Sequence, residues 1–204
     1  MLLRLKMHVK HNNNYSVYTT ADGRQIHIFD NAIDYKGKLY FYRFLKSLSY
    51  KCVNYDLGLP TGDHEPKLRS DITPQIENDL KFFDSVNSPE CSALIKEYSI
   101  KHMYVNLGIP TDYNEIHTDV GGSLLPPNNF MTLLYYVNLE WDLNWGGETI
   151  FYSEALDSIE YISYYIPGRI IIFDQAIPHS ARTQTINANK YRFTLACKLN
   201  KYNI

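Results

Sequence analysis

The sequence has few cysteines, no excess of positive charge and no long hydrophobic run. Its three cysteines, Cys52, Cys91 and Cys197, are an odd number without close spacing, which argues against a disulfide-held secreted fold and favours a reducing, cytoplasmic compartment. The formal net charge of -2 gives no basic field for nucleic acid. No segment approaches the roughly 20 apolar residues of a membrane helix, and no signal-peptide run is present. We therefore expect a soluble protein without a membrane or nucleic-acid partner.

The composition is that of a globular domain. The 204 residues are 45% hydrophobic and 21% charged, which is enough apolar material for one well-buried core and argues against disorder throughout. We expect a single domain over residues 1–204. Residues 1–96 would supply strands and supporting helices, and residues 97–204 would form the β-rich core that carries the chemistry.

The first half of the chain combines strand and hairpin patterns. Residues 3–10 alternate apolar and basic side chains, which is typical of a strand with one buried and one solvated face. The Asp22-Gly23 pair predicts a hairpin turn between strands at residues 15–20 and 25–29, because both residues tolerate left-handed backbone angles. The chain is thus expected to begin with a small sheet.

Helical patterns follow these strands. Aromatic and aliphatic side chains recur at helical spacing within residues 35–50 and predict an amphipathic helix. Thr73-Pro74 and Ser88-Pro89 each place a capping residue before a proline, so each begins a short helix. Cys91 lies on the apolar face of the second short helix and is interpreted as a packing residue. Glycines and prolines in residues 57–69 predict a long loop.

From residue 100 onward the pattern is that of strands. The expected strands cover residues 101–107, 130–139, 148–152, 161–166, 169–173 and 190–199. Seven or eight short strands with glycine-rich turns predict a mostly β fold with flanking helices, a jelly-roll-like double-stranded β-helix. One face of the strand at 101–107 is polar, and buried polar groups in a small barrel suggest a ligand there. His102, on that face, has no suitably spaced partner and is interpreted as a hydrogen-bonded histidine.

One motif in this half suits a metal site. His117 and Asp119 are two residues apart on an extended segment, so their side chains project to the same side. His179 follows sixty residues after Asp119 and is the third candidate ligand. Two imidazoles and one carboxylate can cover one triangular face of an ion and leave the opposite positions open, which suits non-haem Fe(II). A His-x-Asp motif also arises by chance, so its surroundings decide its weight.

Those surroundings carry a family resemblance over about residues 97–199. Six motifs occur in order: His117-Thr118-Asp119, Leu134-Tyr135-Tyr136-Val137-Asn138, Gly146-Gly147-Glu148-Thr149-Ile150-Phe151, Pro167-Gly168-Arg169, Pro178-His179-Ser180 and Tyr191-Arg192-Phe193-Thr194. In this order and spacing they resemble the Fe(II)- and 2-oxoglutarate-dependent oxygenases, nearest to the prolyl 4-hydroxylase-like branch. The first hundred residues are not covered by the resemblance.

The resemblance implies a set of site residues and cofactors. His117, Asp119 and His179 would hold Fe(II), which 2-oxoglutarate would chelate before oxygen reacts, with ascorbate as an optional reductant. Arg192, in an Arg-x-Thr version of the Arg-x-Ser pattern of many members, would hold the far carboxylate of the cosubstrate, because a guanidinium can donate two parallel hydrogen bonds. Lys190 fits the spacing of the nearest branch better and stays open as the alternative cation.

Further aromatic and loop positions complete the expected site. Tyr135 matches a cosubstrate-contacting tyrosine of similar enzymes, and Tyr104 is a weaker candidate for the same role. The loop context of Trp141, Asn144, Trp145 and residues 57–69 suggests that they form the rim of the substrate mouth.

The implied reaction is hydroxylation of an unactivated carbon in a prolyl or other peptidyl or amino-acid substrate, coupled to decarboxylation of 2-oxoglutarate. Three alternatives stay open: a small-metabolite substrate, a nucleic-acid substrate, and a barrel kept as a non-catalytic binding module. Nucleic acid is disfavoured because residues 4–10 hold the only basic cluster in the sequence. A multi-histidine cupin site is disfavoured because Asp119 stands where such sites usually have another histidine.

Overall fold

The computed structural model describes residues 7–10, 14–56, 64–110, 112, 114–120 and 126–202. Most of the predicted loop at 57–69, the start of the first predicted strand and Gly121-Gly122 therefore lie outside the described residues. The strands are β1 (Met7–Lys10), β2 (Tyr15–Thr19), β3 (Gln25–Phe29), β4 (Lys51–Asp56), β5 (His64–Asp71), β6 (Tyr98–Gly108), β7 (Phe130–Tyr136), β8 (Thr149–Tyr152), β9 (Ile159–Ser163), β10 (Ile170–Asp174), β11 (His179–Ala181) and β12 (Arg192–Lys201). The α-helices are α1 (Tyr35–Lys46), α2 (Pro74–Leu80) and α3 (Pro89–Ile95).

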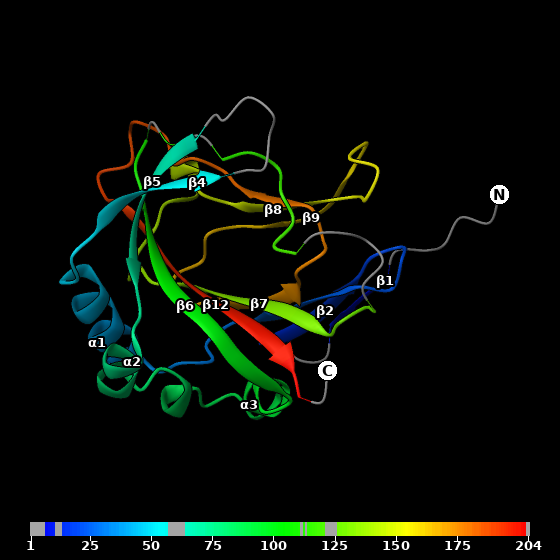
Figure 1. Cartoon of the computed structure of the whole chain (residues 1–204), viewed down its shortest axis with the longest axis horizontal. Coiled ribbons are helices and arrows are strands. Elements are labelled where there is room, and N and C mark those ends of the chain that lie inside the picture. Colours follow the sequence, from blue (N-terminus) through cyan, green and yellow to red (C-terminus); the bar gives the residue numbers. More distant parts are fainter. Residues whose placement is uncertain are drawn as a thin grey trace.

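Two antiparallel sheets form the body of the molecule. The large sheet has the strand order β1-β2-β3-β10-β7-β12-β6-β5-β4, and the small sheet has the order β11-β8-β9. The helices lie on the outer side of the large sheet, away from β8 and β9 (Figure 1). This is the predicted jelly-roll arrangement, mostly strands with helices on the outside.

The main hydrophobic core lies between the helices and the outer face of the large sheet. Phe41 and Leu45 of α1 and Leu80 of α2 are fully buried there against Leu133 and Leu195 of the central strands. A second cluster lies between the two sheets and includes Tyr136, Phe151, Tyr165, Ile171 and Phe173. The central strands are therefore apolar on the helix side and only partly apolar on the inner side, which leaves room for polar inner residues.

The predicted helix starts are confirmed by their caps. The side chain of Thr73 accepts a hydrogen bond from the Ile76 amide, and that of Ser88 accepts one from the Cys91 amide, each before a proline at the first helical turn. Cys91 is fully buried, and burial raises the pKa of its thiol to about 12. It is the packing residue that the pattern predicted.

Two predicted boundaries are wrong. The helix expected over 35–50 ends at Lys46, because the hydroxyl groups of Ser47 and Tyr50 donate to the carbonyls of its last turn. Residues 64–69, expected in a loop, belong to β5, which pairs with β4 and β6 and extends the large sheet. Pro66 lies opposite Asn54 of β4, in a part of β5 that precedes its pairing with β6 at Leu68–Asp71.

Candidate metal centre and its pocket

The backbone brings the three predicted metal ligands together. His117 and His179 form an isolated β-bridge, with amide-to-carbonyl distances of 3.0 and 2.9 Å in the two directions. The amide of Asp119 donates to the carbonyl of Gln175 at 2.8 Å. Three backbone hydrogen bonds thus join the segment that precedes β7 to Gln175 and His179, which lie about sixty residues later in the sequence.

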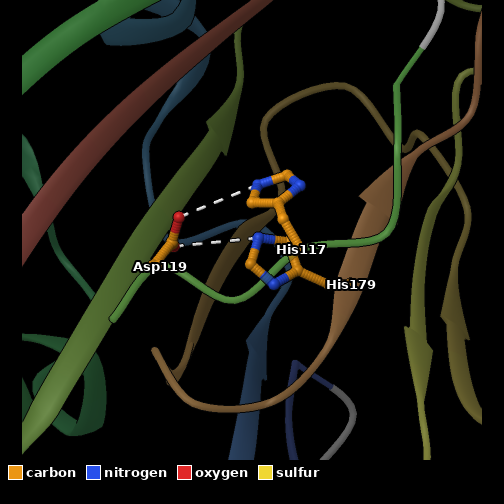
Figure 2. Close-up of side chains that lie close together, drawn as sticks. All are labelled: His117, Asp119 and His179. Carbon is orange, nitrogen blue, oxygen red and sulfur yellow. Dashed lines mark ion pairs between the residues drawn. The ribbon is translucent and has the colours of Figure 1, made fainter. Parts of the chain in front are cut away.

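The side chains of these residues converge on one point (Figure 2). One ligand atom from each of His117, Asp119 and His179 lies within 4.8 Å of the others. The Nε2 atoms of His117 and His179 are 3.9 and 3.7 Å from the Asp119 carboxylate oxygens. These separations suit atoms that share one metal ion at about 2.0–2.2 Å from each ligand.

The Nδ1 atom of each imidazole, which faces away from the centre, is fixed by a hydrogen bond to a backbone carbonyl. His117 Nδ1 lies 3.0 Å from the carbonyl oxygen of Glu115, and His179 Nδ1 lies 2.9 Å from that of Ile177. A carbonyl only accepts, so each Nδ1 carries the hydrogen and each Nε2 presents its lone pair to the centre. The donor set of two imidazole nitrogens and one carboxylate fits a non-haem Fe(II) ion.

The charge states also suit a metal. Burial lowers the pKa of His179 to about 4, so its imidazole is neutral at neutral pH. Burial opposes ionisation of Asp119, but the Lys198 ammonium and the Thr132 hydroxyl hold the pKa of its carboxyl below the usual range. Thr132 donates to Asp119 Oδ2 at 2.5 Å, and Lys198 forms an ion pair with the same oxygen. Asp119 is therefore an ionised carboxylate held from two sides.

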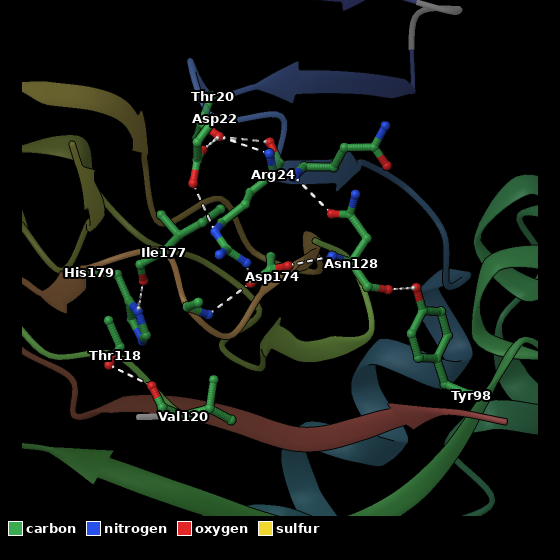
Figure 3. A network of polar contacts seen from close by, with 12 residues as sticks. Thr20, Asp22, Arg24, Tyr98, Thr118, Val120, Asn128, Asp174, Ile177 and His179 are labelled. Carbon is green, nitrogen blue, oxygen red and sulfur yellow. Dashed lines mark hydrogen bonds and ion pairs between the residues drawn. The ribbon is translucent and has the colours of Figure 1, made fainter. Parts of the chain in front are cut away.

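A buried ion pair from the N-terminal hairpin braces the turn behind these ligands (Figure 3). Arg24 donates to Asp174 Oδ1 at 3.0 Å, and their side chains are 5% and 2% exposed. Asp174 also accepts from the amides of Ala176 and Asn128. The turn that begins at Asp174 carries the carbonyls that orient Asp119 and His179. Arg24 thus supports the metal ligands from a segment outside the family resemblance.

We expect Arg24→Leu to lower the free energy of unfolding by about 3 kcal/mol, because it leaves the Asp174 carboxylate buried without its cation. Urea denaturation measures this loss, and the double variant Arg24→Leu/Asp174→Asn should recover most of it. Lys190→Gln, which breaks an exposed pair with Glu140, should cost less than about 1 kcal/mol. Equal losses of unfolding free energy in Arg24→Leu and Lys190→Gln would contradict the stabilising role of the Arg24–Asp174 pair.

The metal group opens into a pocket between the two sheets. The pocket has a volume of about 410 Å³, near the low end of the range of about 300–1,000 Å³ for small-ligand sites. Its walls include the inner side chains of β6, β7 and β12, which are His102, Tyr104, Asn106, Thr132, Leu134, Arg192, Thr194, Ala196 and Lys198. The predicted polar inner face of residues 101–107 is confirmed.

Arg192 is the buried cation of this pocket. Its residue is 7% exposed, its Nε donates to the Gly147 carbonyl at 3.0 Å, and its guanidinium lies 5.2 Å from the Tyr165 ring. Gly147 has φ +85°, and a side-chain carbon there would lie 3.3 Å from both Arg192 and Trp141. The Gly-Gly pair of the motif therefore leaves room for the arginine. No carboxylate of the described residues forms an ion pair with Arg192, so the site suits an anionic ligand.

Two further polar atoms in the same wall point to a ligand. Asn106 Oδ1 and Thr194 Oγ1 are buried without a hydrogen-bond partner in the described structure, and the two residues face each other across β6 and β12. Unpaired buried polar atoms cost free energy. The Thr194 hydroxyl can donate to a bound carboxylate, whereas Asn106 Oδ1 only accepts and would be satisfied by a donor such as a water molecule. A metal-chelating dicarboxylate such as 2-oxoglutarate fits this combination of metal group, arginine and hydroxyl.

Two predicted site residues lie elsewhere. Lys190 is paired with exposed Glu140 and does not line the pocket. Tyr135 is fully buried on the opposite face of β7, where it packs against Phe41 and Phe82 of the helix-side core. Successive strand residues face opposite sides, so the inner positions of β7 are Thr132, Leu134 and Tyr136 instead. The structure does not bring Tyr135 to the pocket of the metal group, where the motif had led us to expect it.

Tyr135→Phe provides a direct check of this placement. The Tyr135 hydroxyl is buried without a hydrogen-bond partner in the described structure, so its removal should stabilise the protein by about 1 kcal/mol. The affinity for 2-oxoglutarate should stay within about twofold of wild type. Thermal unfolding and cosubstrate titration measure the two effects, and a loss of affinity would return Tyr135 to the site.

The predicted rim residues differ in their positions. Trp141 donates to the Gly146 carbonyl at 2.8 Å and packs on Tyr165, so it lies behind Arg192 rather than at the mouth. Asn144 and Trp145 do not line the pocket either. Tyr104 does line it, as does Arg69 at the end of the predicted loop, whose guanidinium lies 3.9 Å from the Tyr104 ring centre.

Some pocket residues were not predicted. They are Lys198 and Thr132, which both contact Asp119. Lys198 had a signal that could have found it: it is six residues after Arg192 and therefore on the same face of the same strand. His102 lies 2.8 Å from Arg69 and 3.2 Å from Asp71, outside the metal group, as a hydrogen-bonded histidine.

Comparison with known proteins decides the fold. A 2OG-Fe(II) oxygenase family oxidoreductase from Burkholderia pseudomallei has 17% identity and a TM-score of 0.58, covering 86% of this chain and 84% of that one. A prolyl hydroxylase from Trichoplax adhaerens, solved with a hypoxia inducible factor peptide, has 15% identity and a TM-score of 0.62, covering 86% and 83%. HygX from Streptomyces hygroscopicus, solved with nickel and 2-oxoglutarate, has 9% identity and a TM-score of 0.61, covering 88% and 84%.

The chain has the fold of the 2OG-Fe(II) oxygenases. The similarity is in structure: no family model matches the sequence, and no curated protein matches it. The oxygenase fold extends over most of the chain and includes strands before the resembling half. Within the described residues, no helix is long and apolar enough to cross a membrane.

Proposed function

We propose that the chain is an Fe(II)- and 2-oxoglutarate-dependent dioxygenase that hydroxylates an unactivated carbon of a prolyl, other peptidyl or amino-acid substrate. The observation that carries the proposal is one pocket lined both by the His117, Asp119 and His179 group and by the buried Arg192, which forms no ion pair with any carboxylate of the described residues. The oxygenase fold supports the same enzyme class.

Each residue of the pocket has a distinct task in this proposal. His117, Asp119 and His179 hold the metal by one triangular face, and Thr132 and Lys198 keep the Asp119 carboxylate ionised and oriented. Arg192 and Thr194 bind the far carboxylate of 2-oxoglutarate, with the guanidinium held by Gly147. Bound Fe(II), 2-oxoglutarate and oxygen would supply the oxidant for a C–H bond and yield succinate and carbon dioxide. The roles of oxygen as a cosubstrate and of ascorbate as an optional reductant are part of this proposal.

The arrangement of the pocket favours accurate placement of both ligands. The Tyr136, Phe151 and Tyr165 cluster closes the space between the sheets behind the site and keeps bulk water out. The hydrogen bonds on His117 and His179 prevent ring rotation, so the three ligand atoms stay preorganised. The chain's own contribution is thus orientation, charge and exclusion of water.

Alternative substrates keep the same chemistry. The Trichoplax neighbour was solved with a peptide, and HygX was also solved with hygromycin B, so the fold accommodates a macromolecular or a small substrate. A peptide is our first proposal, a small metabolite the second. A non-catalytic barrel would have no need for an arginine buried without a carboxylate partner.

Anaerobic titration tests the proposal. Apoprotein titrated with Fe(II) and then 2-oxoglutarate should develop the weak visible charge-transfer band of a chelated keto acid. The band should require both additions, and succinate, which lacks the keto group, is the matched control. Absence of the band when Fe(II) and 2-oxoglutarate are both in excess would contradict the proposed function and favour the binding-module alternative.

A further inference from the structure

The charged side chains of the described residues that line the pocket form ion pairs, with two exceptions. Lys198 forms an ion pair with Asp119, and Arg69 forms one with Asp71. Arg192 is the first exception, and the proposed function assigns it to the far carboxylate of 2-oxoglutarate. The second exception is an acidic residue beside the metal group, to which the proposed function gives no task.

Glu115 is that acidic residue. It lines the pocket together with His117, whereas Ile116 between them does not line it and is 42% exposed. Residues two apart on extended backbone share a face, so the side chains of Glu115 and His117 lie on the same side of the chain. The backbone of Glu115 is also fixed beside the metal group, because its carbonyl oxygen lies 3.0 Å from His117 Nδ1.

The carboxylate of Glu115 has no partner within the described structure. It forms no hydrogen bond or ion pair with any of the described residues, and the residue is only partly exposed. A partly buried carboxylate loses some of its hydration, and a cationic N–H donor in the pocket would replace that hydration. Fe(II) and the 2-oxoglutarate dianion carry opposite charges of equal size, so their binding would leave the charge of Glu115 unmatched.

A second acceptor lines the same pocket. Asn106 Oδ1 is buried without a hydrogen-bond partner in the described structure, and it can only accept. Asn114, which precedes Glu115 in the sequence, borders with Asn106 both this pocket and a neighbouring cavity of about 40 Å³. The N–H donors of a ligand in the pocket therefore suit both the Asn106 oxygen and the Glu115 carboxylate.

We propose that Glu115 is a specificity-determining residue that binds a cationic N–H group, an ammonium or a guanidinium, of the primary substrate. The inference rests on the proposed function, because that function assigns Arg192 to 2-oxoglutarate. Among the proposed substrates, the inference favours a basic amino acid, or a peptide with a lysyl or arginyl side chain at or beside the oxidised residue. An acidic substrate would meet the like charge of Glu115, which disfavours it.

Methylammonium is the probe for this site, and methanol is its neutral analogue. In protein loaded with Mn(II) and saturating 2-oxoglutarate, the methyl protons of methylammonium should show a saturable relaxation enhancement, and those of methanol should show none. Glu115→Gln keeps the size of the side chain and should weaken methylammonium binding by about tenfold or more, the loss expected for one charged hydrogen bond. Glu140→Gln, at an exposed glutamate outside the pocket, should match wild type.

The outcomes separate the inference from the proposed function. Failure of the wild-type protein to bind Mn(II) and 2-oxoglutarate together would overturn both. Normal cosubstrate binding without a saturable effect of methylammonium would overturn the inference alone, and so would an equal effect in Glu115→Gln, which would place the cation elsewhere in the pocket. Glu115→Gln should bind Mn(II) with wild-type affinity, because His117 contacts only the backbone carbonyl of Glu115. Loss of Mn(II) in this variant would make Glu115 part of the metal centre and overturn its proposed role.

Discussion

His179→Ala should lower the affinity for Fe(II) by more than about 1,000-fold, because loss of a group that merely orients a ligand already costs about 10–100-fold. His179 is 6% exposed and its Nε2 lies 3.7 Å from an Asp119 oxygen. A water molecule in the space left by its imidazole would be a poorer metal ligand. Calorimetric titration with Fe(II) under anaerobic conditions, or with Co(II) as a stable substitute, measures the change. Circular dichroism checks that the variant is folded.

His102→Ala is the matched control for this experiment. His102 lines the same pocket but is hydrogen-bonded to Arg69 and Asp71 and lies outside the metal group. Its removal should leave the metal affinity within about threefold of wild type, which is less than 1 kcal/mol. Stoichiometric metal binding in His179→Ala together with its loss in His102→Ala would move the metal centre to the β5–β6 side of the pocket.

The metal group was predictable because its signal is local and periodic. His117 and Asp119 are two residues apart on extended backbone, and side chains at that spacing share a face. His179 required the order of the surrounding motifs, since nothing in sixty residues of spacing fixes a distance. The structure adds what spacing cannot: the reciprocal His117–His179 backbone bridge and the carbonyls that select the ring tautomers.

The misplaced residues show where sequence patterns lose information. β7 is apolar on both faces, so alternation predicts a buried strand but leaves open which face lies inside, and Tyr135 and Tyr136 are adjacent candidates. Only the packing of Tyr135 on α1 assigns the faces. Residues 64–69 form a strand because β4 pairs with all of them and β6 pairs with Leu68 and Arg69, although glycines and prolines nearby predict a loop.

Long-range polar pairs were beyond sequence reasoning. Arg24 and Asp174 are 150 residues apart, and each alone is typical of a solvated surface residue. Their pairing depends on β3 lying beside β10, a consequence of the complete sheet order. Lys198 is a similar case, because its role depends on an ion pair with Asp119, which lies on a different segment of the chain. The candidate metal ligands could therefore be predicted from the sequence, whereas the residues that hold them in place mostly could not.

Arg192→Ala should weaken 2-oxoglutarate binding by about 100-fold or more, since two hydrogen bonds to a charged group contribute about 1.5–3 kcal/mol each. Lys190→Ala is the matched control, because the sequence left both cations open and the structure pairs Lys190 with Glu140 at the surface. Its cosubstrate affinity should equal that of wild type. The charge-transfer band at increasing 2-oxoglutarate concentration measures both dissociation constants.

The Arg192 comparison also separates binding from metal loss. Arg192 is held by Gly147 and the aromatic rings of Tyr136 and Tyr165 rather than by the metal ligands, so Arg192→Ala should leave Fe(II) affinity unchanged while the cosubstrate is lost. Arg192→Lys should recover only part of the affinity, because an ammonium cannot donate two parallel hydrogen bonds to one carboxylate. Weak binding in Lys190→Ala and normal binding in Arg192→Ala would assign the cosubstrate carboxylate to the exposed lysine and leave the buried guanidinium for another anion.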